Sequence, residues 1–138
     1  MDKAWRDVYD FHEAFGVPVR DIPAFMPPER AQKRVLWMEE EIGEFIEAEN
    51  IEEQADAMID LIYFALGTLV EIGVQPQALF DIVHGANMQK LWPDGSPHYN
   101  SDGKVIKPSG WTDPEPLLRA ELERQEKSSR RAAEILKK

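Results

Sequence analysis

Apolar residues recur with helical spacing through most of the chain, and prolines and glycines mark where the helices should end. No proline occurs over residues 29–75, so this window is predicted to be mostly helical. One helix is expected over about 28–49, and a second from about 51 to 72 with Gly73 as its stop. The apolar face of the first of these helices is predicted to consist of Val35, Met38, Ile42, Phe45 and Ile46.

The remaining pattern predicts further helices on either side of this window. A helix is expected over about 2–15, another from Pro76 to near Leu91, and a last one capped by Asp113-Pro114. Between the last two lies a loop over 92–113, whose Asp-Gly pairs predict a small hairpin around residues 104–107. We therefore predict an all-α protein of four to five helices, with one domain over 1–118 and a charged helical extension over 119–138.

The charge of the chain is concentrated in its middle. The 138 residues carry 26 acidic and 16 basic side chains, a net charge of −10, yet residues 35–89 hold twelve acids and no Lys or Arg. This charge argues against binding to a nucleic-acid polymer or an anionic membrane, because both need a positive surface. The longest apolar stretch, 57–70, contains Asp60 and is too short to span a membrane.

The chain has no cysteine, which excludes disulfides, thiolate zinc sites and cysteine nucleophiles. It is therefore compatible with a reducing cytosol, and the charged N-terminal residues do not resemble an export signal. We expect a cytoplasmic protein.

The acids of the two central helices form a pattern that suggests a cation site. Glu41 and Glu44 lie side by side at the edge of an apolar face, and Asp56 and Asp60 share one stripe of a helix that is apolar almost all round, with Glu53 beside them. A buried, ionised Asp must be paired, protonated or bound to a cation. Since no Lys or Arg is nearby, a hard divalent cation such as Mg²⁺ fits best.

Two other metal sites are excluded by spacing. A ferritin-like di-iron centre needs Glu-x-x-His pairs, but no His occurs between His12 and His84. The region from Asp94 to Asp102 lacks the acidic spacing of an EF-hand. A non-catalytic helical module, whose acids dock a basic partner, remains an alternative to an enzyme.

The first cations after the acidic block stand where they can meet phosphates. Lys90 lies at a helix end, and Lys104 and Lys107 lie in the glycine-containing loop that follows. Cations on a mobile loop can close over phosphate groups, although each lysine is equally well explained as an ordinary solvated side chain. Asn87 places an amide on an apolar stripe and therefore needs a partner, from the fold or from a ligand.

Four segments in this order resemble the MazG-like all-α nucleoside triphosphate pyrophosphohydrolases, which include phosphoribosyl-ATP pyrophosphohydrolase and the dimeric dUTPases. The resemblance covers roughly residues 5–118. The segments that carry it are Glu40–Phe45 (EEIGEF), Asp56–Leu69 (DAMIDLIYFALGTL), His84–Leu91 (HGANMQKL) and Asp102–Pro108 (DGKVIKP).

The resemblance implies a set of Mg²⁺ ligands on the two central helices. The family has Glu-x-x-Glu on one helix, matched by Glu41 and Glu44, and Glu-x-x-Asp on the next, where Asp60 matches the aspartate. Ala57 stands where the family glutamate is expected, so Asp56 is the favoured replacement.

Glu53 is the reserve candidate to replace the missing family glutamate. Glu40 or Glu41 is expected to orient the attacking water. The resemblance further implies that Asn87 and Lys90 contact sugar or phosphate, while Lys104 and Lys107 close over the triphosphate.

The activity implied by the resemblance is Mg²⁺-dependent cleavage of a (d)NTP to its monophosphate and pyrophosphate, with Mn²⁺ as a substitute metal. Candidate substrates are dUTP or non-standard nucleotides, or alternatively phosphoribosyl-ATP. The helical bundle is expected to be completed by assembly into a homodimer or homotetramer.

Overall fold

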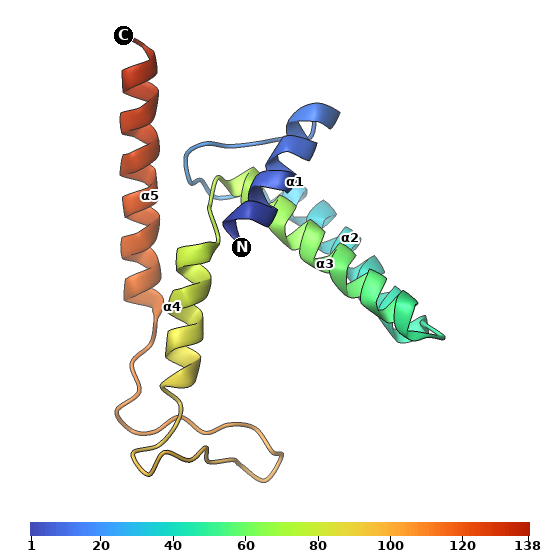
Figure 1. The fold of residues 1–138 in the computed structure, drawn as a ribbon, viewed down its shortest axis with the longest axis vertical. Coiled ribbons are helices and arrows are strands. Elements are labelled where there is room, and N and C mark those ends of the chain that lie inside the picture. Colours follow the sequence, from blue (N-terminus) through green and yellow to red (C-terminus); the bar gives the residue numbers. More distant parts are fainter. The chain divides into compact units, whose positions relative to one another are not determined.

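The computed structural model describes all residues, 1–138, and is all-helical as predicted (Figure 1). The chain forms two compact units, one from Met1–Pro76 with Gln125–Lys138 and the other from Gln77–Arg124. No single helix is long and apolar enough to cross a membrane. The helices are α1 (Asp2–Phe15), α2 (Pro28–Glu47), α3 (Ile51–Ile72), α4 (Gln77–Met88) and α5 (Glu115–Leu136).

The ends of the first three helices follow the local signals in the sequence. Pro28 is the first residue of α2, where its missing N–H costs no hydrogen bond. At the start of α3, Asn50 Oδ1 accepts a hydrogen bond from the Glu53 amide at 2.9 Å, and Glu53 Oε2 accepts one from the Glu49 amide at 2.8 Å. Gly73 ends α3 in the left-handed conformation, with φ 73°.

In the first unit, α2 and α3 lie side by side and α1 packs against α3 (Figure 1). Their hydrophobic core consists of Trp5, Val8, Leu66 and Val70. The segment after α1 is tied to the end of α3, because the Ala24 amide donates to the Ile72 carbonyl at 2.9 Å. This segment passes so close to Gly73 that a Cβ there would lie 2.6 Å from a backbone oxygen.

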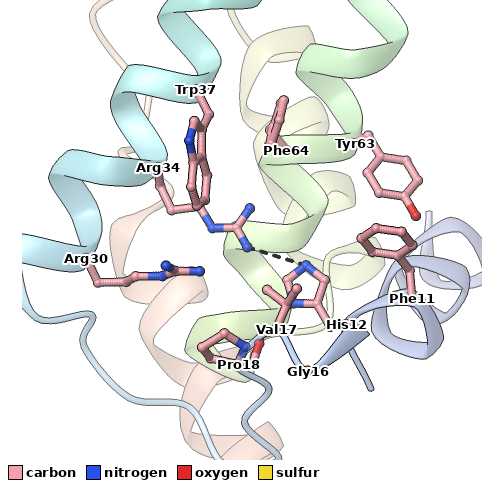
Figure 2. A pocket seen from close by; sticks show the side chains of 10 residues that line it. All are labelled: Phe11, His12, Gly16, Val17, Pro18, Arg30, Arg34, Trp37, Tyr63 and Phe64. Atoms are coloured by element: carbon pink, nitrogen blue, oxygen red, sulfur yellow. Dashed lines mark hydrogen bonds between the residues drawn. The ribbon is translucent and has the colours of Figure 1, made fainter. Parts of the chain in front are cut away.

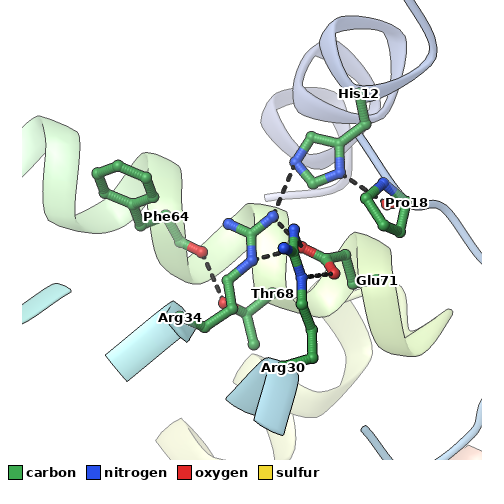
Figure 3. A network of polar contacts seen from close by, with 7 residues as sticks. All are labelled: His12, Pro18, Arg30, Arg34, Phe64, Thr68 and Glu71. Atoms are coloured by element: carbon green, nitrogen blue, oxygen red, sulfur yellow. Dashed lines mark hydrogen bonds and ion pairs between the residues drawn. The ribbon is translucent and has the colours of Figure 1, made fainter. Parts of the chain in front are cut away.

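A buried network of charged side chains joins the three helices (Figure 3). From α2, Arg30 donates two hydrogen bonds to Glu71 of α3, at 2.7 and 3.0 Å, and Arg34 forms an ion pair with the same carboxylate. Arg34 also donates to Nε2 of His12, on α1, at 3.4 Å. Arg34, Glu71 and His12 are all buried, so these contacts replace the water that each group gives up.

The protonation states in this network follow from its geometry. Burial would raise the pKa of Glu71, but the hydrogen bonds from Arg30 and Arg34 outweigh it and hold that pKa below its usual range. For His12, burial lowers the pKa from 6.5. The ring is therefore neutral at pH 7, and because its Nδ1 lies 2.9 Å from the Pro18 carbonyl, Nδ1 carries the proton and Nε2 accepts from Arg34.

The predicted apolar face of α2 is largely exposed within one chain. Ile42 is 45% exposed and Ile46 is 77% exposed, and on α3 Ile59 is 60% exposed. A helix that is apolar almost all round is expected to be buried, but within a single chain α3 is buried along one stripe only. Its buried stripe consists of Ala57, Leu66, Gly67, Val70 and Glu71.

In the second unit, α4 ends at Met88, earlier than predicted, and the following loop contains one antiparallel bridge between Tyr99 and Val105. The predicted hairpin is thus reduced to a single bridge. The indole of Trp92 donates to the Ile106 carbonyl at 3.0 Å, and that of Trp111 donates to the Ala86 carbonyl at 2.7 Å. The division into 1–118 and 119–138 stays a prediction, and α5 begins before it, at Glu115.

We expect Gly67→Ala to destabilise the protein and Gly43→Ala to leave it unchanged or more stable. A Cβ on Gly67 would lie 2.8 Å from His12 Nε2 and 2.9 Å from Arg34 Nη1, and both side chains are held by other hydrogen bonds. Such overpacking costs about 1–3 kcal/mol. Gly43 has open space around its Cβ position, so alanine there gains about 1 kcal/mol of helix propensity. Thermal unfolding of both variants, followed by circular dichroism, measures the difference.

We also expect the protein to lose stability as the pH falls below about 6.5. Because the pKa of His12 is lower in the folded chain than its ordinary 6.5, the unfolded chain binds more protons in this window. The melting temperature should therefore fall between pH 7.5 and 5.5. In His12→Asn, whose amide can still donate to the Pro18 carbonyl, the melting temperature should fall less than in the wild type. In His84→Asn, the exposed control, it should fall as much as in the wild type. Equal pH dependence in all three proteins would contradict this assignment.

Candidate functional site

The acids of α2 and α3 meet in the middle of the two helices. Glu41 is only 8% exposed, and its Oε2 is buried without any hydrogen-bond partner. Burial, followed by the nearby charges of Glu44 and Asp60, raises the pKa of Glu41 above its usual range. Glu41, Glu44 and Asp60 thus lie close enough for their charges to interact, and their role as metal ligands stays a prediction.

A second group of acids lines a hollow where α2 ends and α3 begins. The hollow has a volume of about 260 Å³, and its walls include Glu44, Glu53 and Asp56. Glu44 therefore belongs to both groups of acids. Glu53 already caps α3 through its Oε2, which leaves Asp56 less committed to the fold than Glu53.

The pairing of α2 with α3 explains why these acids meet. Along the two helices, Arg34 lies against Gly67, Trp37 stacks on Phe64 with ring centroids 5.9 Å apart, and Glu41 comes near Asp60. From one pair to the next, the residue number rises by about one turn on α2 and falls by about one turn on α3, as expected for neighbouring antiparallel helices.

The burial of these acids differs from the expectation. Asp56 and Asp60 are exposed within one chain, so the inference that they are buried charges in need of a cation is wrong there. The buried acid without a partner is Glu41 instead. Arg34, the arginine that precedes these acids on α2, is paired with Glu71 and not with them. Glu40, one of the two expected catalytic acids, is exposed.

The second unit brings together three of the four residues expected to contact the substrate. Lys90 Nζ donates to Asn87 Oδ1 at 2.8 Å. The ammonium groups of Lys90 and Lys107 lie 5.9 and 4.1 Å from the ring centre of Trp111. Lys104 is not part of this group. One aromatic ring therefore holds two cations next to an amide.

A cavity that was not predicted from the sequence lies between α1, α2 and α3 (Figure 2). Its volume is about 410 Å³. Two signals in the sequence could have indicated it. Arg30 and Arg34 stand one turn apart at the start of a helix whose later charged residues are all acidic, and Gly67 interrupts an apolar helix where a larger residue would be expected.

Comparison with known proteins identifies the family. The family model for phosphoribosyl-ATP pyrophosphohydrolase matches residues 8–87, more than half of the chain. The chain belongs to this family. It is also similar to a presumed NTP pyrophosphohydrolase from Exiguobacterium sp. 255-15, with 36% identity and a TM-score of 0.53 over 91% of this chain and 96% of that one. No match was found among curated proteins.

The acids of this phosphoribosyl-ATP pyrophosphohydrolase family member suit a divalent cation, although no three of its acidic or histidine side chains stand ready around one point. The orphaned Oε2 of Glu41 provides the test of fit, because it is a buried carboxylate oxygen with no donor in the protein. A hard cation satisfies such an oxygen, and Glu44 and Asp60 lie near enough for their charges to act on Glu41. The buried carboxylate oxygen is thus of the kind that Mg²⁺ takes as a ligand, and binding of Mg²⁺ stays a prediction.

Glu41→Gln should raise the melting temperature of the metal-free protein at pH 7. The raised pKa of Glu41 means that its ionised form is unfavourable in the fold. This cost grows as the pH rises above the ordinary 4.5 and is complete above the raised pKa. A neutral amide removes the repulsion from Glu44 and Asp60. The stability difference should shrink as the pH is lowered towards 4.5. Glu39→Gln, an exposed change on the same helix, serves as the control, and an equal effect in both variants would contradict the assignment.

Proposed function

We propose that the protein is a Mg²⁺-dependent nucleoside triphosphate pyrophosphohydrolase. Membership of the family supports a pyrophosphohydrolase, and the partnerless carboxylate of Glu41 beside Glu44 and Asp60 is the observation that supports a metal site. In this proposal Glu41, Glu44 and Asp60 hold the metal, with Asp56 next to Glu44 and Glu53 in reserve. Mn²⁺ is the expected substitute.

The reaction is hydrolysis at the α-phosphorus. Bound Mg²⁺ would neutralise phosphate oxygens and lower the pKa of a water molecule. Glu40, an exposed carboxylate next to the metal-binding acids, accepts a proton from the attacking water; Glu41 is the alternative base. The new bond joins the water oxygen to the α-phosphorus, and the bond to the β-phosphate oxygen breaks, so that a monophosphate and pyrophosphate leave.

The lysines of the second unit supply the positive charge for the phosphates. Asn87 and Lys90 are proposed to contact sugar or phosphate, and Lys107 and Lys104 to close over the triphosphate. Lys90 and Lys107 gather at Trp111, which supports this role because their charges add at one place.

We further propose that the protein is a homodimer or homotetramer in the cytoplasm. The exposed apolar residues of α2 and α3, such as Ile42, Ile46 and Ile59, support assembly, since monomers rarely expose so many apolar side chains on neighbouring helices. Substrates are a nucleoside triphosphate such as dUTP or a non-standard nucleotide. Phosphoribosyl-ATP is a second candidate, because the matching family model carries that description.

With Mg²⁺, the purified protein should convert at least one (d)NTP, or phosphoribosyl-ATP, to a monophosphate and pyrophosphate. Loss of a residue that only supports a metal ligand already costs up to about 100-fold in activity. Glu44→Gln and Asp60→Asn remove proposed direct ligands, so each should lower activity by at least this factor. Pyrophosphate release, coupled to a colorimetric phosphate assay, measures turnover. Mg²⁺ should also raise the melting temperature of the wild type more than that of either variant.

Two control variants are available on the same helices, since Glu39 of α2 and Glu52 of α3 are exposed acids outside both groups. Glu39→Gln and Glu52→Gln should keep wild-type turnover. The proposal would be overturned if no nucleotide in a full panel is hydrolysed with either Mg²⁺ or Mn²⁺. Wild-type rates in Glu44→Gln and Asp60→Asn would also overturn it. Absence of hydrolysis, together with no rise in melting temperature on addition of Mg²⁺, would favour the non-catalytic acidic module.

A further inference from the structure

The cavity between α1, α2 and α3 has walls of aromatic rings. We call it the ring cavity; Phe11, Trp37, Tyr63 and Phe64 line it (Figure 2). Trp37 and Phe64 stack with an interplanar angle of 28°, and Phe11 meets Tyr63 edge to face at 5.6 Å. A volume of about 410 Å³ accommodates one planar heterocycle with room for its sugar.

Its polar groups are hydrogen-bond donors that the fold has not used up. Arg30 engages Glu71 through Nε and Nη2, and Arg34 engages Glu71 and His12 through Nε and Nη2. The Nη1 atom of each guanidinium has no hydrogen-bond partner. Figure 2 shows this atom of Arg34 pointing past Trp37 towards Phe64. Two guanidinium groups share one carboxylate, so the network carries an excess positive charge at the cavity wall.

The side-chain acceptors of the cavity wall and of the ion network attached to it are already occupied. Both oxygens of Glu71 accept from the arginines, and Nε2 of His12 accepts from Arg34. Apart from the Tyr63 hydroxyl, which can donate or accept, the side chains offer only N–H groups to a ligand. An amino group placed against them would put donor against donor, and a carbonyl oxygen would complete the pairing.

The ring cavity lies one helical turn from the proposed metal-binding acids on both helices. Trp37 precedes Glu41 by one turn of α2, and Phe64 follows Asp60 by one turn of α3, a rise of about 6 Å in each case. A nucleotide separates its base from its α-phosphate by a single sugar, which is a comparable span.

We propose that the ring cavity binds the base of the substrate and selects bases with a carbonyl at ring position 4 of a pyrimidine or 6 of a purine. Amino bases at these positions are disfavoured, because their N–H groups face the N–H groups of Arg30 and Arg34. The rings of Trp37 and Phe64 provide stacking that does not distinguish between bases. This inference rests on the proposed function, since it assigns the nucleotide's phosphates to the acids.

Matched nucleotide pairs test the selection. The pairs are dUTP with dCTP, and dITP with dATP. Within each pair the first base has a carbonyl, and the second an amino group, at pyrimidine position 4 or purine position 6. We expect kcat/KM to favour dUTP and dITP by about tenfold or more, because leaving buried donors unpaired is costly. Ratios within about twofold in both pairs, or a preference for the amino bases, would overturn the inference even if turnover is fast.

Variants separate selection from stacking. Arg34→Gln offers an amide oxygen in place of a donor, so the keto preference should fall towards unity; if it does not fold, Arg34→Gln with Glu71→Gln keeps a neutral pair. Phe64→Leu should raise KM for all four nucleotides without changing the ratios. Phe25→Leu, at an exposed phenylalanine outside the cavity, should change neither. An unchanged ratio in a folded Arg34 variant would overturn the role of the arginines, and the wild-type ratios decide the selection itself.

Binding without turnover distinguishes failure of this inference from failure of the proposed function. Calorimetric titration with dUMP and dCMP needs no catalysis and should show tighter binding of dUMP. If no triphosphate is cleaved but dUMP binds more tightly than dCMP, the proposed function fails and the base selection stands. If triphosphates are cleaved but dUMP and dCMP bind equally, the base selection fails alone. Absence of both turnover and monophosphate binding overturns both.

Discussion

The ion network around Glu71 is the interaction on which the first unit depends. A carboxylate that is almost entirely buried must be matched by positive charge, and Arg30 and Arg34 match it from the neighbouring helix. Removing one partner of such a buried pair costs about 3–5 kcal/mol. Because His12 accepts from Arg34 and donates to the Pro18 carbonyl, the same network also holds α1 and the segment that follows it.

This network also determines where the candidate site can lie. With Glu71 opposite Arg30 and Arg34, the antiparallel pairing of α2 and α3 places Trp37 on Phe64 and then Glu41 near Asp60, turn by turn. A shift of one turn would bury a charge without a partner, so the network fixes the register. The groups proposed to bind the base and the metal are thus placed along the same pair of helices by a contact that belongs to neither.

Gly67 shows how closely the network and the cavity are linked. Both His12 and Arg34 reach the space that a side chain at this position would fill, so the glycine makes room for their polar ends. The glycine therefore lets two side chains that line the ring cavity, those of His12 and Arg34, approach α3 closely. The turn that contains Gly67 lies between Phe64, which lines the cavity, and Glu71, which anchors the arginines.

The sequence by itself determined where the helices begin and end and which acids are spaced as candidate metal ligands. Pro28, Asn50 and Gly73 are local signals, and each acts on the backbone of its own turn, so α2 and α3 begin and end close to the predicted residues. The spacing of Glu41, Glu44 and Asp60 on their own helices is likewise local. Only the tertiary structure decided which acid is buried, since burial depends on how two helices face each other. It placed Glu41 inside, left Asp56 and Asp60 exposed, and joined Arg30 and Arg34 to Glu71, a partner about 40 residues away that periodicity alone cannot choose.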